Sequence, residues 1–395
     1  MIDMLLEWAS LLIRWTHVIC GICWIGSSFY FIALDAGLQS NPRLDPKVKG
    51  EAWQVHGGGF YNIQKFSVAP DFLPEHLTWF KWEAYATWVF GLALLILIYY
   101  FNASLYLIDP TVMTLTPGVA VAIAGGSLVL GWVVYDTLCR SWFGLTTSRL
   151  ALSGFVLLVA ATYGYTHVFS GQGAFIQVGA LVGTIMAANV AMIIIPNQRK
   201  TVACLLKGEE PNPIWGAQAK QRSVHNNYTT LPVLFTMLSS HYAFTYANKY
   251  SWLVLAGIFI ATFLVRHWFN TMHSGAKPDW KLWPAAAVPF FGAMILTQVG
   301  APGVANVGNV TFAEVAPIFE QRCHTCHAAK PTFEGLDAAP KGVMFDTPQM
   351  IKRQAPLIMV QAVVTRVMPL GNITEITDEE RAKIAAWING GAKLD

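Results

Sequence analysis

The sequence contains few charged residues. Asp, Glu, Lys and Arg make up 12% of its 395 residues, about half of the roughly 25% that is typical of soluble proteins. The net charge is only +3 and no dense basic patch occurs, so the sequence gives no sign of a nucleic-acid partner. Of six cysteines, Cys20, Cys23, Cys139 and Cys204 lie in or beside apolar segments. A disulfide framework is therefore not expected.

Apolar residues dominate instead, at 54% of the chain with 15 tryptophans, which are typical of membrane interfaces. The first apolar run, about Met4 to Leu34, lacks a basic n-region and a small-residue cleavage site, so we interpret it as a retained membrane helix. Further runs of about 20 residues, the length that a bilayer requires, follow near 82–101, 119–138, 151–169, 175–195, 229–247, 251–270 and 281–299. The sequence therefore predicts an eight-helix transmembrane bundle over residues 1–300.

The distribution of Lys and Arg predicts how this bundle is oriented. If the N-terminus is outside, the predicted outside loops between spans contain a single cationic residue, Lys249. The predicted inside loops carry fourteen: Arg43, Lys47, Lys49, Lys65, Lys81, Arg140, Arg149, Arg199, Lys200, Lys207, Lys220, Arg222, Lys277 and Lys281. This bias predicts a multi-pass protein of a bacterial inner membrane whose N-terminus and C-terminal part both face the periplasm.

The most specific motif is Cys323-His324-Thr325-Cys326-His327. Two cysteines separated by two residues and followed by histidine form the attachment signature of a c-type haem. Cys323 and Cys326 are expected to form thioethers to the porphyrin, and His327 to be the proximal iron ligand. A zinc site would need further Cys or His nearby, and none follows in the remaining chain. Attachment of such a haem in the periplasm agrees with the predicted orientation.

The residues around this motif predict a small all-α cytochrome c domain over 311–395, joined to the bundle by an uncharged linker at 301–310. Thr311 and Glu314 have capping-box spacing before the motif, and Thr377 and Glu380 repeat it before a last helix. The predicted fold class is thus all-α throughout.

Met368 is the expected distal iron ligand. It precedes Pro369 in a loop before the last helix, 41 residues beyond His327. Met344 and Met359 are the alternatives, although Met359 resembles a packing residue. His/Met ligation raises the potential of a haem, which suits an electron acceptor.

Polar residues inside the first apolar run suggest a second activity, since one helix would suffice as an anchor. Arg14, His17, Gly21, Trp24 and Ser28 recur at helical spacing on one stripe. Arg14 lies roughly 15 Å from the start of this run at 1.5 Å per residue. A charged side chain at that depth in a bilayer is energetically costly, which makes a functional role the first hypothesis for it. The alternative is that Arg14 snorkels to the outer interface.

His17 and His241 lie within apolar runs, and histidines from two helices can ligate a b-type haem. A second haem, of type b, is therefore one hypothesis. Proton carriage or contact with a substrate are the alternatives for these two residues.

Further candidates lie toward the inner side. His56 precedes three glycines in Val55–Phe60, which allow either close approach to a ligand or a flexible re-entrant turn. Glu83 is a candidate base. Arg266, His267, Asn270 and His273 cluster at the end of the seventh span.

The chain resembles the bacterial membrane-bound urate oxidases (urate hydroxylases), which join an eight-helix membrane domain to a C-terminal cytochrome c. The resemblance covers essentially the whole chain. It rests on RWTHVICGICWIGSSFYFIALD, VHGGGFYNIQKF and WFKWEAYATWVFG, and on the terminal CHTCH with VMPLGN. The haem motif shows no departure from the family pattern.

The resemblance implies oxidation of urate with water to 5-hydroxyisourate. The electrons would leave through the haem, toward a downstream periplasmic cytochrome or terminal oxidase, instead of passing directly to oxygen. Urate is an anion, so its site needs Arg or Lys and a base near neutral pKa. Catalytic candidates are Arg14 and His17 in the outer half, or His56, Glu83 and His273, with Lys65 and Arg266, on the inner side. The alternative functions are an electron-transfer subunit that passes electrons from quinol to cytochrome c, and a transporter with a redox sensor, which the lack of repeat symmetry disfavours.

Overall fold

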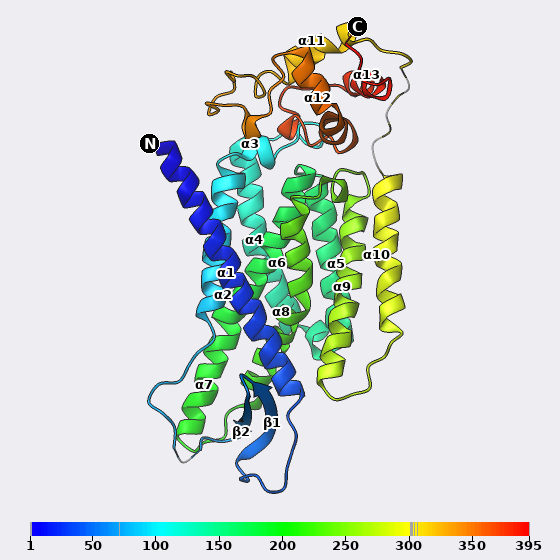
Figure 1. Ribbon diagram of the computed structural model, residues 1–395. Coiled ribbons are helices and arrows are strands. Elements are labelled where there is room, and N and C mark those ends of the chain that lie inside the picture. Colours follow the sequence, from blue (N-terminus) through cyan, green and yellow to red (C-terminus); the bar gives the residue numbers. More distant parts are fainter. Residues whose placement is uncertain (1, 71, 301–302, 304, 306, 395) are drawn as a thin grey trace.

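The computed structural model describes residues 2–70, 72–300, 303, 305 and 307–394. Its larger part is a bundle of long helices (Figure 1). These are α1 (Ile2–Ala36), α2 (Trp82–Leu94), α4 (Pro117–Arg140), α5 (Thr147–Thr166), α6 (Gly171–Ala188), α7 (Ile195–Leu206), α8 (Pro213–Ser239), α9 (Ser251–His273) and α10 (Leu282–Val299), with a short α3 (Ala103–Tyr106). Single π-helical turns extend α2 through Leu95–Tyr100 and join α6 to α7 through Asn189–Ile194.

Seven helical segments of the described chain are long and apolar enough to cross a membrane. They coincide with seven of the eight predicted spans. The sixth predicted span, 229–247, differs: α8 begins at Pro213, ends at Ser239, and is followed by a 3-10 turn at Ala243–Thr245. Arg222, which the sequence placed in an inside loop, is instead buried in α8, with 2% of its surface exposed.

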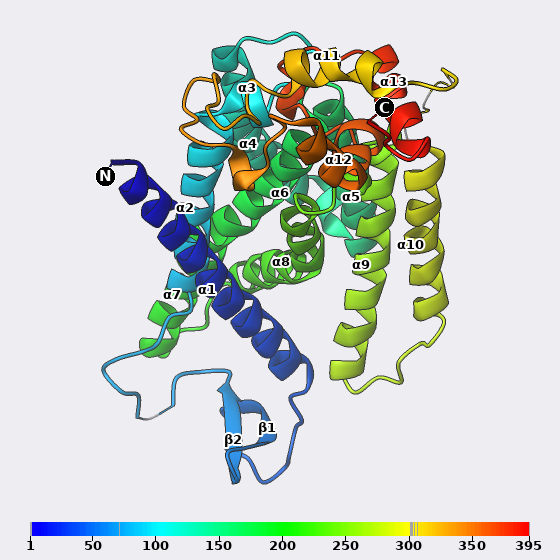
Figure 2. The same ribbon diagram turned by 45° about the horizontal axis from the view of Figure 1, so that its top comes forward.

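The bundle is built around α6 and α8. The core between the helices contains Phe169, Phe175 and Val178, which are fully buried, together with small residues such as Ala120 and Ala124 that let α4 approach α6 closely. By contrast, α1 lies across the outside of the bundle (Figure 2), and none of the residues in its most apolar stretch is buried. It packs mainly along α2.

The prediction of an all-α fold was wrong for one segment. The strands β1 (Val48–His56) and β2 (Gly59–Phe66) form an antiparallel hairpin beyond one end of the bundle (Figure 1). The turn has positive φ at Gly57 (59°) and Gly58 (79°), as a two-residue type I′ turn requires. The glycines after His56 therefore make a tight turn, which explains them without a ligand.

The C-terminal part is a separate small cluster of helices at the opposite end of the bundle, the end at which α1 begins (Figure 1). It contains α11 (Phe312–Arg322), α12 (Pro348–Ile358), a π-helical turn at Met359–Val364 and α13 (Asp378–Asn389), with 3-10 turns at Pro340–Gly342 and Leu370–Asn372. Both expected capping boxes are present, at Thr311 and Thr377. Its own core includes Val315, Phe319 and Trp387.

Candidate functional site

The two cysteines of the CxxCH motif directly follow α11. Cys323 packs against the core of the C-terminal part. Burial raises the pKa of the Cys323 thiol to about 12 and also raises the pKa of Cys326. Thiols with a raised pKa are not poised for redox exchange. The packing of Cys323 against an apolar core fits attachment to the edge of a porphyrin.

His327 is oriented as an iron ligand needs to be. Its Nδ1 lies 2.9 Å from the carbonyl oxygen of Val343, so Nδ1 carries the proton and Nε2 keeps a free lone pair. A metal-ligating histidine usually donates its other ring N–H to a carbonyl in this way. His324, the other histidine of the motif, is engaged through Nε2 with the carbonyl of Phe345 at 2.6 Å. The residues present therefore fit a c-type haem, with Cys323, Cys326 and His327 in the expected roles.

Met368 lies in the loop between the π-helical turn and α13 and packs against the same core as Cys323. Its backbone is fixed on both sides: the Met368 N–H donates to Gln361 O at 2.9 Å, and Arg381 Nη1 donates to Met368 O at 2.8 Å. Met359 begins the π-helical turn and packs against this core as well. Distal ligation by Met368 remains a prediction that a well-anchored loop supports.

Two of the catalytic candidates lie on α1, in different surroundings. His17 contacts α2, with Nδ1 2.8 Å from Thr87 O and its ring against Gly91, where an added Cβ would come within 2.8 Å of Cε1. Arg14 is exposed and forms no hydrogen bond or ion pair with a described residue. The predicted stripe thus contributes one residue to a helix interface and leaves the other without a described hydrogen bond or ion pair.

The inner candidates are spread over three elements. His56 is exposed at the tip of the hairpin, Glu83 is in the first turn of α2, and His273 ends α9 with Nδ1 buried and without a described partner. His241, paired with His17 in the haem b hypothesis, is exposed just after α8. Within the described chain no hydrogen bond joins any two of these residues, so the structure does not assemble them into one site.

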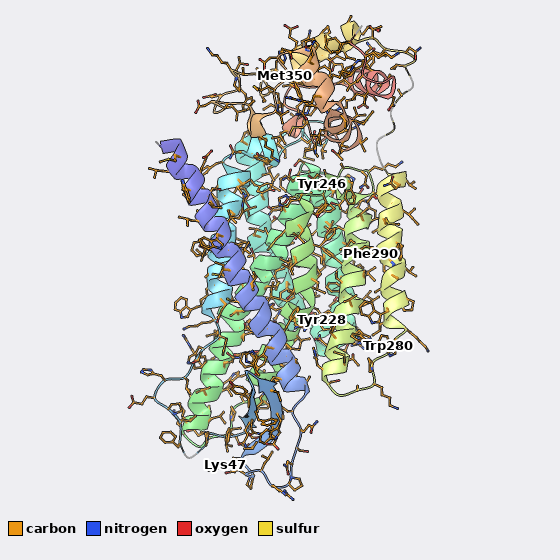
Figure 3. The ribbon with its side chains drawn as sticks, viewed as in Figure 1. Lys47, Tyr228, Tyr246, Trp280, Phe290 and Met350 are labelled. Atoms are coloured by element: carbon orange, nitrogen blue, oxygen red, sulfur yellow. The ribbon has the colours of Figure 1, made fainter. Side chains whose placement is uncertain are left out.

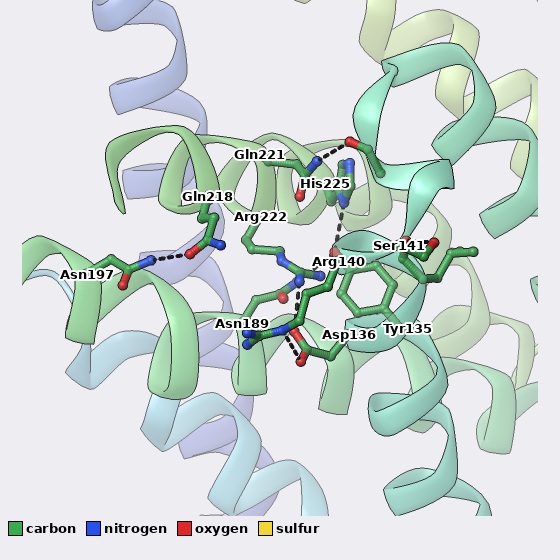
Figure 4. A network of polar contacts seen from close by, with 12 residues as sticks. Tyr135, Asp136, Arg140, Ser141, Asn189, Asn197, Gln218, Gln221, Arg222 and His225 are labelled. Atoms are coloured by element: carbon green, nitrogen blue, oxygen red, sulfur yellow. Dashed lines mark hydrogen bonds and ion pairs between the residues drawn. The ribbon is translucent and has the colours of Figure 1, made fainter. Parts of the chain in front are cut away.

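The structure instead assembles polar residues around α8, most of which the sequence analysis missed. In Figure 4, Tyr135 Oη lies 2.7 Å from His225 Nδ1, and Asn189 Nδ2 donates to Tyr135 Oη at 3.2 Å. Arg222 Nη2 donates to Asp136 Oδ1 at 2.7 Å, and Asp136 also accepts from Arg140. This network, defined here as the Tyr135–His225 network, gives Arg222 a carboxylate partner inside the bundle.

A second group of polar residues connects α8 with α9. Asn227 Oδ1 accepts from Arg266 Nε at 2.8 Å and from Asn270 Nδ2 at 2.9 Å. The next residue, Tyr228, contacts His267 Nδ1 through Oη at 2.7 Å. Asn227 is fully buried and Arg266 is 3% exposed. The sequence signal for this group is the polar run from Arg222 to Thr230 in α8, of which Arg222, Asn226, Asn227 and Thr230 are buried.

A cavity of about 520 Å³ lies between the bundle and the C-terminal part. Its walls include Tyr106, His167 and Lys249 from the bundle, and Arg366 and Gly371 from the loop that carries Met368. Gly371 approaches the α3 segment so closely that an added Cβ would lie 2.6 Å from Ser104 O. The loop around Met368 is therefore seated directly on the bundle.

These features define a helical protein whose described chain has seven helical segments long and apolar enough to cross a membrane, buried polar networks, and a small C-terminal part with a haem-attachment motif. The model of the urate oxidase N-terminal family matches residues 3–298. The chain belongs to this family, which supports an oxidoreductase related to urate oxidation and agrees with the resemblance found in the sequence. No curated protein and no solved structure matches the chain.

Proposed function

We propose that the protein is a membrane-bound urate oxidase that passes its electrons to a c-type haem in its own C-terminal part. Urate and water would give 5-hydroxyisourate, two protons and two electrons. A c-type haem held by Cys323, Cys326 and His327 would accept one electron at a time, so each urate would require two successive one-electron transfers. The electrons would then leave to a periplasmic cytochrome or a terminal oxidase.

The observation that carries this proposal is the arrangement of His327. Its Nδ1 is held by Val343 O, its Nε2 is free, and the two cysteines of the motif lie in the same helix-end segment. The C-terminal part with this histidine follows a bundle that matches the urate oxidase N-terminal family over residues 3–298. When bound, the haem supplies an electron acceptor whose potential depends on its axial ligands.

The contact between the two parts supports electron transfer within one chain. The Leu370–Asn372 turn, two residues after Met368, packs against α3 of the bundle. Electrons released in the bundle would therefore enter the C-terminal part on the side of Met368. Arg366 and Gly371 of this loop also line the interfacial cavity.

The proposal is tested on the purified full-length protein in detergent. After addition of urate, the urate absorbance should fall and the c-type haem should become reduced in parallel. Reduction of the haem by a quinol but not by urate would favour the electron-transfer subunit and refute the oxidase.

The second cofactor hypothesis has its own test. A pyridine haemochrome spectrum of pure c-type, at one haem per chain, would eliminate a b-type haem at His17 and His241. A mixed spectrum would require a second site in the bundle.

A further inference from the structure

Arg266 is a buried cation without an anionic partner. It lies in α9, is 3% exposed, and forms no ion pair with any described carboxylate. Two other arginines of the described chain are buried. Arg222 pairs with Asp136 at 2.7 Å, although its Nε and Nη1 have no described hydrogen-bond partner, and Arg381 donates to backbone carbonyls. A guanidinium removed from water without such partners is strongly unfavourable. Arg266 has neither a carboxylate nor a backbone carbonyl as a described partner, whereas each of the other two arginines has one of these.

Three polar atoms around Arg266 are also unpaired. Asn227 Oδ1 holds both Arg266 Nε and Asn270 Nδ2, which leaves Arg266 Nη2, Asn227 Nδ2 and Asn270 Oδ1 buried and without a described hydrogen-bond partner. His273 Nδ1, three residues after Asn270, is buried and unpaired as well. Buried polar groups in proteins are almost always paired. Two free donors, one free acceptor and one histidine nitrogen in adjacent turns therefore indicate a ligand.

The helix that covers this cluster, α1, lies on the outside of the bundle (Figure 2). The ring of Phe29, on α1, lies 3.6 Å from the Arg266 guanidinium carbon. This cation–π contact is the kind of interaction that holds a guanidinium when no anion is present. The apolar stretch of α1 contains no buried residue, so Phe29 can move aside, or stack on a planar guest, at little cost in packing.

We propose that Arg266, Asn227 and Asn270, covered by Phe29, bind the substrate as a planar heterocyclic anion. The inference rests on the proposed function, under which this anion is urate. Arg266 would neutralise the charge and donate to a ring carbonyl. The two asparagine side chains would match the alternating N–H and C=O groups on the edge of the ring, since an amide offers both a donor and an acceptor.

The location of this site has a consequence for electron transfer. Tyr228, the neighbour of Asn227, lies in the half of the bundle that is remote from the C-terminal part (Figure 3). The substrate would therefore enter from the end that carries the hairpin, and the electrons would have to cross the bundle to reach the Met368 loop. The Tyr135–His225 network does not contact this cluster through any described hydrogen bond.

The test compares urate binding to the full-length holoprotein and to Arg266→Gln by anaerobic equilibrium dialysis, with the haem reduced beforehand by dithionite so that urate is bound and not oxidised. We expect Arg266→Gln to raise the Kd for urate roughly 10- to 100-fold, because a charged hydrogen bond to an anion is lost. Arg266→Lys should recover only part of this loss, since it keeps the charge but not the planar fork. Asn270→Ala, on the half-buried edge of the cluster, should raise the Kd by a smaller factor. Arg199→Gln, at an exposed cation of α7, is the matched control and should leave the Kd unchanged.

The outcomes separate this proposal from the proposed function. Arg266→Gln removes a buried charge that has no carboxylate partner, so its thermal unfolding midpoint should not fall, whereas a purely structural arginine would lower the midpoint and leave the Kd alone. If the parent protein binds urate and all variants bind it equally well, the site assignment is wrong and urate oxidation stands. If the parent protein neither binds nor oxidises urate, both are wrong.

Discussion

Arg381 gives the sharpest prediction for the C-terminal part. It lies in α13, 5% exposed, and its Nη1 donates to the carbonyl oxygens of Ala362 and Met368, while Nη2 donates to Asn372 Oδ1 at 3.1 Å. The side chain thus connects α13 to the backbone on both sides of the predicted iron ligand. We expect Arg381→Met to release the Met368 loop.

The magnitude follows from two opposing terms. The substitution leaves two buried carbonyls without a donor, at about 1–3 kcal/mol each. Burial, and then the charge of Arg366, lower the pKa of Arg381 to about 10, which shows that keeping the cation there opposes folding. Removing the cation recovers part of the loss. We therefore expect a net destabilisation of about 2–3 kcal/mol, together with a lower haem potential, since loss of methionine ligation lowers the potential.

The assay follows thermal unfolding of the haem-containing part by the Soret signal, and the methionine–iron charge-transfer band of the oxidised protein. Arg353→Met, at an exposed arginine of α12, is the matched control and should change neither. Arg381→Met with an unaltered band, potential and unfolding midpoint would show that this arginine does not position the ligand loop.

Three further predictions concern Met368, Gly91 and Glu380. Met368→Ala should lower the haem potential and abolish the charge-transfer band; an unchanged band would assign the distal position to another methionine. Gly91→Ala would bring a Cβ within 2.8 Å of His17 Cε1, so it should destabilise the detergent-solubilised protein by about 1–3 kcal/mol, and an unchanged melting temperature would contradict the contact. Partial burial raises the pKa of Glu380, but hydrogen bonds from Thr377 and Arg322 outweigh it and hold the pKa below its ordinary 4.5. Its stabilising effect is thus complete above about pH 4.5 and is lost as the pH falls through the lower folded value, so Glu380→Gln should flatten the acid limb of the unfolding curve, and an identical acid limb would refute this.

The sequence predicted the apolar helices well because a long hydrophobic run in a bilayer can satisfy its backbone hydrogen bonds within itself only as a helix. Seven of the eight runs match helices that can cross a membrane. The sixth was misplaced because α8 keeps polar residues, among them Arg222 and Asn226, on a buried face. There Arg222 pairs with Asp136 of α4, and Asn226 bonds to Asn189 and to the backbone of Met186. A hydropathy criterion places the end of a membrane span at such polar residues, even when they are buried within a helix.

The site could be predicted only in part. The CxxCH motif is local in the sequence, so its chemistry could be read directly, and the structure gives His327 a suitable orientation. The glycines after His56 were ambiguous, since a turn and a ligand loop require the same positive φ angles. The Arg266 cluster is formed where α1, α8 and α9 pack together. The periodicity of a single segment cannot predict which residues of three different helices come into contact.

The central claim is that electrons from urate leave through the haem and not directly to oxygen. An anaerobic titration of the fully oxidised protein with limiting urate tests it most directly. We predict that each urate consumed reduces two haems, without any oxygen present, and that 5-hydroxyisourate appears in equal amount to the urate lost. Urate that stays intact until oxygen is admitted, with the haem still oxidised, would contradict the account.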